Sequence, residues 1–172
     1  MTTAERTFPP YISDERSSLE GWLDFHRATL AAKCAGLDDQ QLREASVPPS
    51  MMTLLGLVRH MAEVERAWFR NVFAGDTTAE PLYYTDEDPD GDFRVSATDT
   101  WDEAHAAWQT QIAAARDIVQ GRSLDAVSTG RRHRDGAQVD LRWIYVHMIE
   151  EYARHNGHAD FLRERIDGAT GS

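Results

Sequence analysis

The chain is poor in the residues that covalent cross-links and membrane spans require. Its single cysteine, Cys34, cannot form a disulfide bond within the chain. No apolar run approaches the roughly 18 residues that a membrane-spanning helix needs. Lysine is almost missing as well, since Lys33 is the only one among 18 basic residues. These shortages exclude the disulfide-rich and membrane-spanning classes, and we expect a soluble globular protein.

Positive charge is also scarce, because 29 acidic residues give a net charge of -11 at pH 7. Such an excess repels nucleic acid and anionic membrane surfaces. The only dense basic cluster is RRHR at 131–134. We interpret it as a loop, with a phosphate or carboxylate contact as the alternative. Neither nucleic acid nor a membrane is expected as a partner.

The length and the first residues suggest one domain in the cytoplasm. A chain of 172 residues suits a single domain with one core, here residues 1–172. The opening MTTAERTFPP has no charged segment followed by an apolar one, so no signal peptide is expected. A cytoplasmic location is the resulting prediction.

Helical periodicity dominates the sequence, and strand alternation is nearly absent. We expect a short helical turn at 38–44 and a break at VPPS, residues 47–50. The long helices are predicted at about 14–36, 53–74, 99–120 and 140–166. Their expected N-caps are Ser13 or Asp14, Thr53, Asp99 and Asp140, and their expected ends are Gly36, Gly75 and Gly168. The simplest arrangement is an all-α, up-and-down four-helix bundle.

The predicted helices carry apolar stripes with a spacing of three and four residues. In the first helix the stripe is Leu19, Trp22, Leu23, His26, Leu30 and Lys33; in the second it is Leu54, Leu57, Met61, Val64, Trp68 and Val72. Trp101 and Trp108 of the third predicted helix are expected in the protein core, and His105, on the same helix, is interpreted as partly exposed. Trp68 and Trp143 are expected as core or dimer contacts.

Two long connections separate the last three helices. The first, at 76–98, is acidic and contains Pro81, Pro89 and Gly91; loops of this length are usually functional or mobile. Its segment 81–93 either lines a pocket, through Tyr83, Tyr84 and Phe93, or is a solvated acidic loop. The second connection, at 121–139, holds three glycines and the basic cluster.

The last predicted helix contains the polar stretch HMIEEYARHNGH, residues 147–158. Glu151 and His155 are four residues apart and therefore lie on one face. His155 occupies a core position in the sevenfold series of Leu141, Met148 and Leu162. Burying a carboxylate in the interior of a helical bundle costs several kcal/mol unless the carboxylate is paired or binds a cation.

His60 repeats this pattern on the second predicted helix, where it borders the core face between Leu57 and Val64. A lone histidine on an apolar face is usually a hydrogen-bonded core residue. Two histidines and one glutamate on two helices instead suit a metal site in the interior of a helical bundle. Both interpretations, a metal site and hydrogen-bonded core residues, stay open. This donor set fits Zn(II), or Fe(II), Ni(II) or Mn(II). It matches neither the di-iron pattern nor H-E-x-x-H.

Two stretches, TLLGLVRHMAEVERAWF and HMIEEYARHNGHADFLRERIDG, resemble the DinB-like superfamily of metal-binding four-helix bundles. The resemblance is greatest to the branch of mycothiol-dependent maleylpyruvate isomerases and mycothiol S-transferases. It implies a DinB/YfiT-like fold with His60, Glu151 and His155 as metal ligands. It also implies that His147 and His158 are neighbours rather than ligands, and that homodimers are common.

The function that this resemblance implies is metal-dependent transfer of a thiol, with mycothiol as cosubstrate, Zn(II) as the preferred metal and an unidentified electrophile. The chain ends six residues after Ile166, without the C-terminal domain of the isomerases, so we expect thiol transfer rather than isomerisation. The nucleophile would belong to the cosubstrate, and Cys34 is interpreted as a small core residue. A metal-dependent hydrolase and a non-catalytic metal-binding stress protein are the alternatives.

Overall fold

The computed structural model describes residues 6–171, and within them the regular structure is helical. Residues 1–5, part of the segment where no signal peptide was expected, and Ser172 lie outside this range. The elements are α1 (Glu15–Cys34), α2 (Asp39–Leu42), α3 (Leu54–Glu65), the π-helix η1 (Arg66–Phe73), α4 (Trp101–Val119) and α5 (Leu141–Asp167). The prediction of an all-α protein is therefore confirmed.

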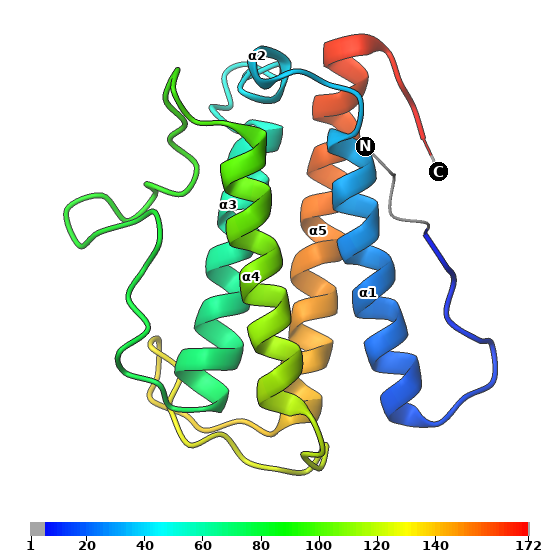
Figure 1. Ribbon diagram of the computed structural model, residues 1–172, viewed down its shortest axis with the longest axis vertical. Helices are drawn as coiled ribbons and strands as arrows, with labels where there is room; N and C mark the ends of the chain where they lie inside the picture. Colours follow the sequence, from blue (N-terminus) through cyan, green and yellow to red (C-terminus); the bar gives the residue numbers. More distant parts are fainter. Residues whose placement is uncertain (1–5, 172) are drawn as a thin grey trace.

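The long helices stand side by side along the longest axis of the molecule (Figure 1). Helix α5 packs against α1 and α3, and α3 packs against α4. Their shared interior holds the predicted core positions Leu141, Met148 and Leu162 of α5, together with Trp108 of α4. Trp22 is the exception: it was expected in the core stripe of α1 but is 39% exposed, and it packs on Phe25 and Phe8 at the surface.

Most helix ends follow the predicted caps. The side chains of Asp14, Thr53 and Asp140 accept hydrogen bonds from the first turns of α1, α3 and α5, and Gly168 ends α5 in the left-handed conformation. The predicted cap Asp99 is wrong, because Thr100 caps α4. The Asp99 carboxylate is instead bound by Arg59 and by the backbone N–H of Ser96.

The second predicted helix changes its winding after Glu65. Its first part, α3, is α-helical, and its second part, η1, is a π-helix with the wider i to i+5 spacing. The carbonyls of Val72 and Phe73 at its end accept hydrogen bonds from the backbone N–H groups of Gly130 and Thr129, at 2.9 Å each. The connection 121–139 therefore closes this end of the molecule.

A buried polar network joins the four long helical segments. Arg27 of α1 donates to both oxygens of Glu65 on α3, at 2.8 Å each. The hydroxyl of Tyr152 on α5 donates to the same carboxylate at 2.7 Å, and the indole N–H of Trp108 on α4 donates to that hydroxyl at 2.7 Å. Because these groups are buried and mutually satisfied, the network fixes how the helices are placed relative to one another.

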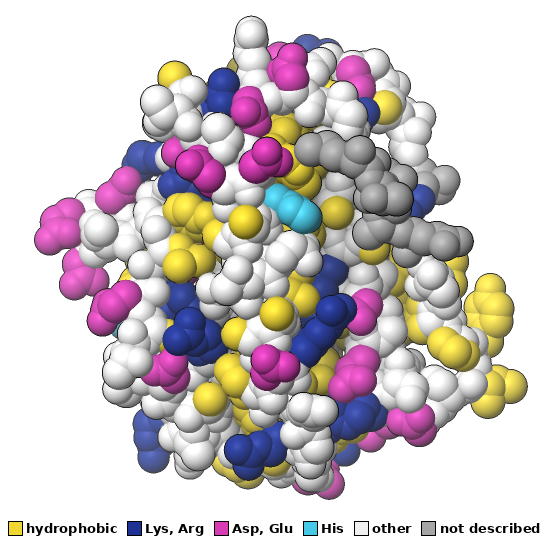
Figure 2. Space-filling view, viewed as in Figure 1, with side chains coloured by type: hydrophobic (Ala, Val, Ile, Leu, Met, Phe, Trp, Pro, Cys, Tyr) yellow, Lys and Arg dark blue, Asp and Glu magenta, His cyan; other side chains and the backbone are white. Residues whose placement is uncertain are grey.

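The acidic connection 76–98 runs along the outer side of α3, at the left of Figure 1, and its acidic side chains lie along the same edge in Figure 2. Two buried charges of α3 and η1 hold it in place. Glu63 accepts hydrogen bonds from the backbone N–H groups of Leu82 and Tyr83, at 2.6 and 2.7 Å. Arg66 pairs with Glu63 and donates to the carbonyl of Ala79. This connection is thus fastened to the helix that carries His60.

Within residues 6–171, none of the helices combines the length and the apolar character that crossing a membrane requires.

Candidate metal centre

His60 lies on α3 between the loop 76–98 and α5. Its Nδ1 is 2.7 Å from the Oδ2 of Asp92, and its ring stacks on Phe93 with the centroids 4.5 Å apart and the planes inclined by 25°. A carboxylate oxygen accepts a hydrogen bond, so this contact favours the tautomer of His60 that carries its proton on Nδ1. The Nε2 atom of His60 is then left with a free lone pair.

Glu151 and His155 lie one turn apart on α5, facing α3. The Oε2 of Glu151 is 3.4 Å from the Nε2 of His155, and the ring centroids of His155 and His60 are 4.7 Å apart. One donor atom each from His60, Glu151 and His155 can be chosen such that all lie within 4.8 Å of one another. The structure therefore brings the three predicted residues together.

The chemical type of these donors, and the spacing of the Glu151–His155 pair, suit a divalent cation. The 3.4 Å separation between Glu151 and His155 exceeds the roughly 2.7–2.9 Å of a charge-assisted hydrogen bond. A tetrahedral cation with bonds of about 2.0–2.2 Å would hold its ligand atoms about 3.3–3.6 Å apart, which matches this separation. Two imidazoles and one carboxylate are also a common donor set for Zn(II) and other transition metals. That these residues bind a metal stays a prediction.

The carboxylate of Glu151 is only partly buried and is in its charged form near neutral pH. Contact with His155 lowers the pKa of Glu151, burial opposes this effect, and His147 adds to the lowering. The Nε2 of His147 lies 3.5 Å from Oε1 of Glu151, on the opposite side from His155. Glu151 is thus positioned between two imidazoles on its own helix and is available as an anionic ligand.

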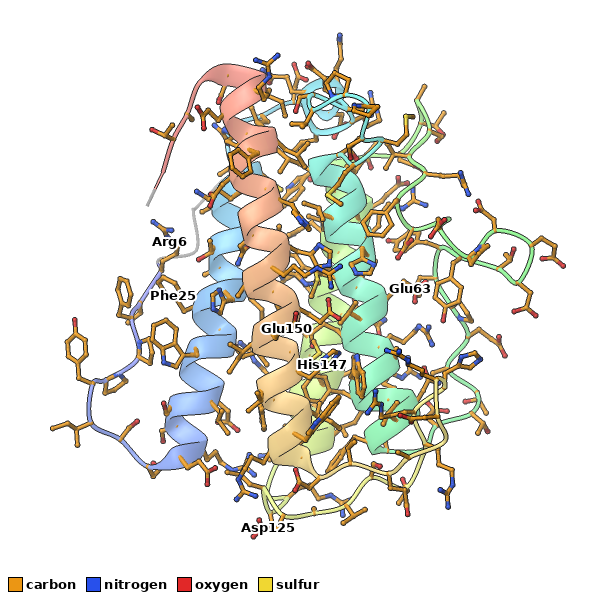
Figure 3. The ribbon with its side chains drawn as sticks, turned by 180° about the vertical axis from the view of Figure 1, so that it is seen from behind. Arg6, Phe25, Glu63, Asp125, His147 and Glu150 are labelled. Atoms are coloured by element: carbon orange, nitrogen blue, oxygen red, sulfur yellow. The ribbon has the colours of Figure 1, made fainter. Side chains whose placement is uncertain are left out.

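The other two histidines of the stretch occupy flanking positions. Figure 3 shows His147 between α5 and α3, and its ring contacts Trp68 and Trp143 with centroid distances of 4.3 and 5.0 Å. His158 places its Nδ1 3.3 Å from Nδ1 of His155. His147, Glu150 and Glu151 form a second group whose donor atoms lie close together. His147 and His158 are outside the group of His60, Glu151 and His155, and that they are not ligands, as the family resemblance implies, stays a prediction.

The three aromatic residues of the loop 76–98 that were predicted to line a pocket lie in two different places. Phe93 covers the ring of His60, whereas Tyr83 lies under the guanidinium of Arg59, 4.4 Å from ring centroid to carbon, and Tyr84 accepts a hydrogen bond from Arg66. On α4, His105 stacks on Trp101 at 4.8 Å. Cys34 is buried, as predicted for a small core residue.

Asp92 is the residue of the site that sequence reasoning missed. It lies 32 residues beyond His60 in an irregular loop, where no periodicity indicates which of many acidic side chains turns inward. Its position directly before Phe93, a predicted pocket residue, was the available signal.

A separate crevice of about 510 Å³ lies between α1 and α4, lined by residues such as Arg16, Asp24, Arg116 and Tyr145 but by none of the three candidate ligands.

Comparison with known proteins identifies the family of the chain. A search among curated proteins found no match. The family model described as Mycothiol-S-transferase matches residues 18–168, which include α1 from Ser18 onward, the loop 76–98 and all three candidate ligands. This family relationship indicates a transferase that uses mycothiol, a small-molecule thiol. The chain belongs to the mycothiol S-transferase family.

Proposed function

We propose that this protein is a metal-dependent mycothiol S-transferase in which His60, Glu151 and His155 hold one divalent cation. The observation that carries the proposal is the convergence of their donor atoms, within 4.8 Å of one another, in a chain of the mycothiol S-transferase family. Zn(II) fits the donor set best, and Ni(II), Fe(II) and Mn(II) are the alternatives. We further propose that residues 1–172 form one DinB/YfiT-like domain, an up-and-down four-helix bundle, and that it acts in the cytoplasm.

The chemistry needs a thiolate, because the thiol form of mycothiol is a weak nucleophile near neutral pH. A bound divalent cation supplies this by lowering the pKa of a coordinated thiol. The residues of the chain set the charge around it. Neutral His60 and His155 add no charge to that of the divalent cation. The carboxylate of Glu151 cancels one of its two positive charges, so the centre keeps a net positive charge that attracts an anionic sulfur.

Neighbouring side chains position these donors. Asp92 and Phe93 hold the ring of His60, and Trp68 and Trp143 pack around His147 beside Glu151. Cys34 takes no part, because it is buried on α1 and its burial raises the pKa of its thiol to about 12. The new carbon–sulfur bond therefore forms with the sulfur of the cosubstrate, whose thiol proton passes to solvent. With an aryl halide as electrophile, the carbon–halogen bond breaks and a halide ion leaves.

The decisive experiment compares three preparations of the protein with mycothiol and a generic aryl halide electrophile. These are the protein as purified, the protein stripped by a chelator, and the stripped protein reloaded with Zn(II). We expect conjugate formation to disappear on stripping and to return on reloading. Full activity in protein shown by elemental analysis to be metal-free would reject metal dependence.

The same assay separates the alternative functions. A hydrolase would consume the electrophile without consuming mycothiol, and a non-catalytic metal-binding protein would consume neither. Cysteine in place of mycothiol serves as the control thiol, since it offers the same sulfur chemistry without the sugar portion.

A further inference from the structure

We propose that Asp92 is a positioning residue of the metal centre, which holds His60 in the one tautomer that can bind a metal through Nε2. This inference rests on the metal site of the proposed function and adds a fourth residue, from the loop 76–98, that contacts no metal itself. The starting observation is the 2.7 Å contact between Oδ2 of Asp92 and Nδ1 of His60.

Both oxygens of Asp92 are engaged. Oδ1 accepts the backbone N–H of Phe93 at 3.0 Å, while Oδ2 faces His60, and the residue is only 5% exposed. A carboxylate oxygen 2.7 Å from Nδ1 is placed to accept the N–H of that nitrogen, so the geometry favours the tautomer with the proton on Nδ1. The lone pair then stays on Nε2. Carboxylate partners of this kind orient the histidine ligands of many metal sites and raise their basicity.

Phe93 complements this hydrogen bond. Its ring stacks on His60 at 4.5 Å with an inclination of 25°, while the hydrogen bond fixes the rotation of the imidazole in its own plane. Two adjacent loop residues thus restrict both degrees of freedom of one ring. A ligand that is already oriented binds a metal more tightly, because less conformational entropy is lost.

The loop is built to keep Asp92 in this place. Arg59, one residue before His60, donates to the carbonyl of Gly91 at 3.0 Å. At Gly91 a β-carbon would lie 2.4 Å from the carbonyl oxygen of Tyr83. The backbone at residue 91 can therefore approach the backbone at Tyr83 this closely only because residue 91 is glycine.

Further along α3, Glu63 binds the backbone of the same loop through Leu82 and Tyr83 (Glu63 is labelled in Figure 3). The ligand and its positioning residue are therefore attached to the same helix.

The first test measures the tautomer of His60 in metal-free protein by the ring ¹⁵N chemical shifts. We expect a proton on Nδ1 in the unmodified chain. In Asp92→Ala the acceptor is removed, and we expect the proton to move in a large part of the molecules to Nε2, where it blocks the metal-binding lone pair. An unchanged tautomer in Asp92→Ala would overturn the proposal. This measurement needs neither metal nor enzymatic activity.

The second test measures Zn(II) affinity by competition with a chromogenic chelator. We expect Asp92→Ala to bind Zn(II) about 10–100-fold more weakly, as for other partners of histidine ligands. Asp92→Asn keeps an oxygen that can accept from Nδ1 and should lose less. The matched control is Asp86→Asn, an exposed acid of the same loop, which should bind Zn(II) as the unmodified chain does. Equal affinity in all four proteins would contradict the proposal.

Release of the loop is the structural explanation to be excluded. Arg94 is exposed beside Asp92, so a released loop would be cut faster by trypsin at that residue. We expect Asp92→Asn to be cut as slowly as the unmodified chain while its Zn(II) affinity falls. Weaker binding found only in variants with faster cleavage would show that Asp92 acts through the fold of the loop, and would overturn the positioning role.

The outcomes also separate this inference from the proposed function. If Asp92→Ala weakens Zn(II) binding but the unmodified protein forms no mycothiol conjugate, the positioning role stands and the transferase proposal fails. If conjugation depends on the metal but Asp92→Ala leaves both tautomer and affinity unchanged, only the positioning role fails. An unmodified chain that binds no divalent metal would overturn both.

Discussion

Glu65 of α3 receives two of the three hydrogen bonds of the Arg27 guanidinium of α1, at 2.8 Å each, in a position where the glutamate side chain has no exposed surface. Burial alone would lower the pKa of Arg27, but Glu65, together with Tyr152 and Asp24, raises it overall, so Arg27 stays charged. The hydroxyl of Tyr152 adds a third hydrogen bond to the same carboxylate. An ion pair with its remaining positions satisfied in this way is costly to break from one side.

Arg27→Ala should therefore lower the free energy of unfolding by about 3–5 kcal/mol, because it leaves the charge of Glu65 buried with less compensation. The control is Arg116→Ala, which removes the exposed ion pair with Asp24 and should cost no more than about 1 kcal/mol. Urea denaturation of both variants measures the difference. Similar losses in the two proteins would show that the buried pair has no special weight.

Cys34 should be unreactive in the folded protein, because its burial raises the pKa of the thiol to about 12 and only the thiolate is alkylated readily. We expect iodoacetamide to leave Cys34 unmodified at pH 8 and to modify it after unfolding in urea. Cys34→Ala should keep the rate of mycothiol conjugation. Rapid alkylation of the native chain, or loss of transfer in Cys34→Ala, would contradict the assignment of Cys34 to the core.

The same raised pKa makes the contribution of Cys34 to stability depend on pH. Its ordinary value is 9.0, so the unfolded chain loses this proton before the folded chain does as the pH rises. The contribution is intact below about pH 9 and decreases between about pH 9 and pH 12. Comparing urea midpoints of the unmodified chain and Cys34→Ala between pH 8 and 11 should show the stability difference shift in favour of Cys34→Ala as the pH rises.

The family resemblance predicts a homodimer, and the surface has apolar side chains for such a contact. Phe161 on α5 is 68% exposed, and Phe8, Tyr11 and Ile12 are exposed on the N-terminal segment. We expect light scattering to give the mass of a dimer at micromolar concentration, and Phe161→Glu to shift the mass towards the monomer. A monomeric unmodified chain would reject the prediction.

The sequence predicted the helices well because their periodicity and caps are local properties. Thr53 and Asp140 begin their helices as expected, and His155 lies in the core at its predicted heptad position. Periodicity could not locate the change to a π-helix after Glu65, where the backbone hydrogen bonds span five residues instead of four. It also placed Trp22 inside, although long aromatic side chains can pack along a helix surface.

The site was predictable to the extent that its donors are on helices. His60, Glu151 and His155 were found by their inward register on two long segments, and the structure brings them together. Asp92 could not be found in this way, since it is placed by tertiary contacts of Arg59 and Gly91 rather than by a repeat. Glu63 and Glu65 were missed for a related reason: their burial depends in part on partners distant in sequence, the loop backbone at Leu82 and Tyr83 for Glu63 and the Arg27 side chain for Glu65.

Glu151→Gln, measured for metal content and mycothiol conjugation on one sample, tests the account most directly. The substitution keeps the size of the side chain but removes the charge that a cation needs, and a neutral amide is a poor ligand for Zn(II). We predict that metal content and conjugation fall together. Helicity and the melting temperature of the metal-free protein should be kept, because Glu151 is partly exposed and its contacts with His147 and His155, at 3.5 and 3.4 Å, are longer than a charge-assisted hydrogen bond. Full metal occupancy in Glu151→Gln, or a collapse of the fold with metal content unchanged, would contradict the account.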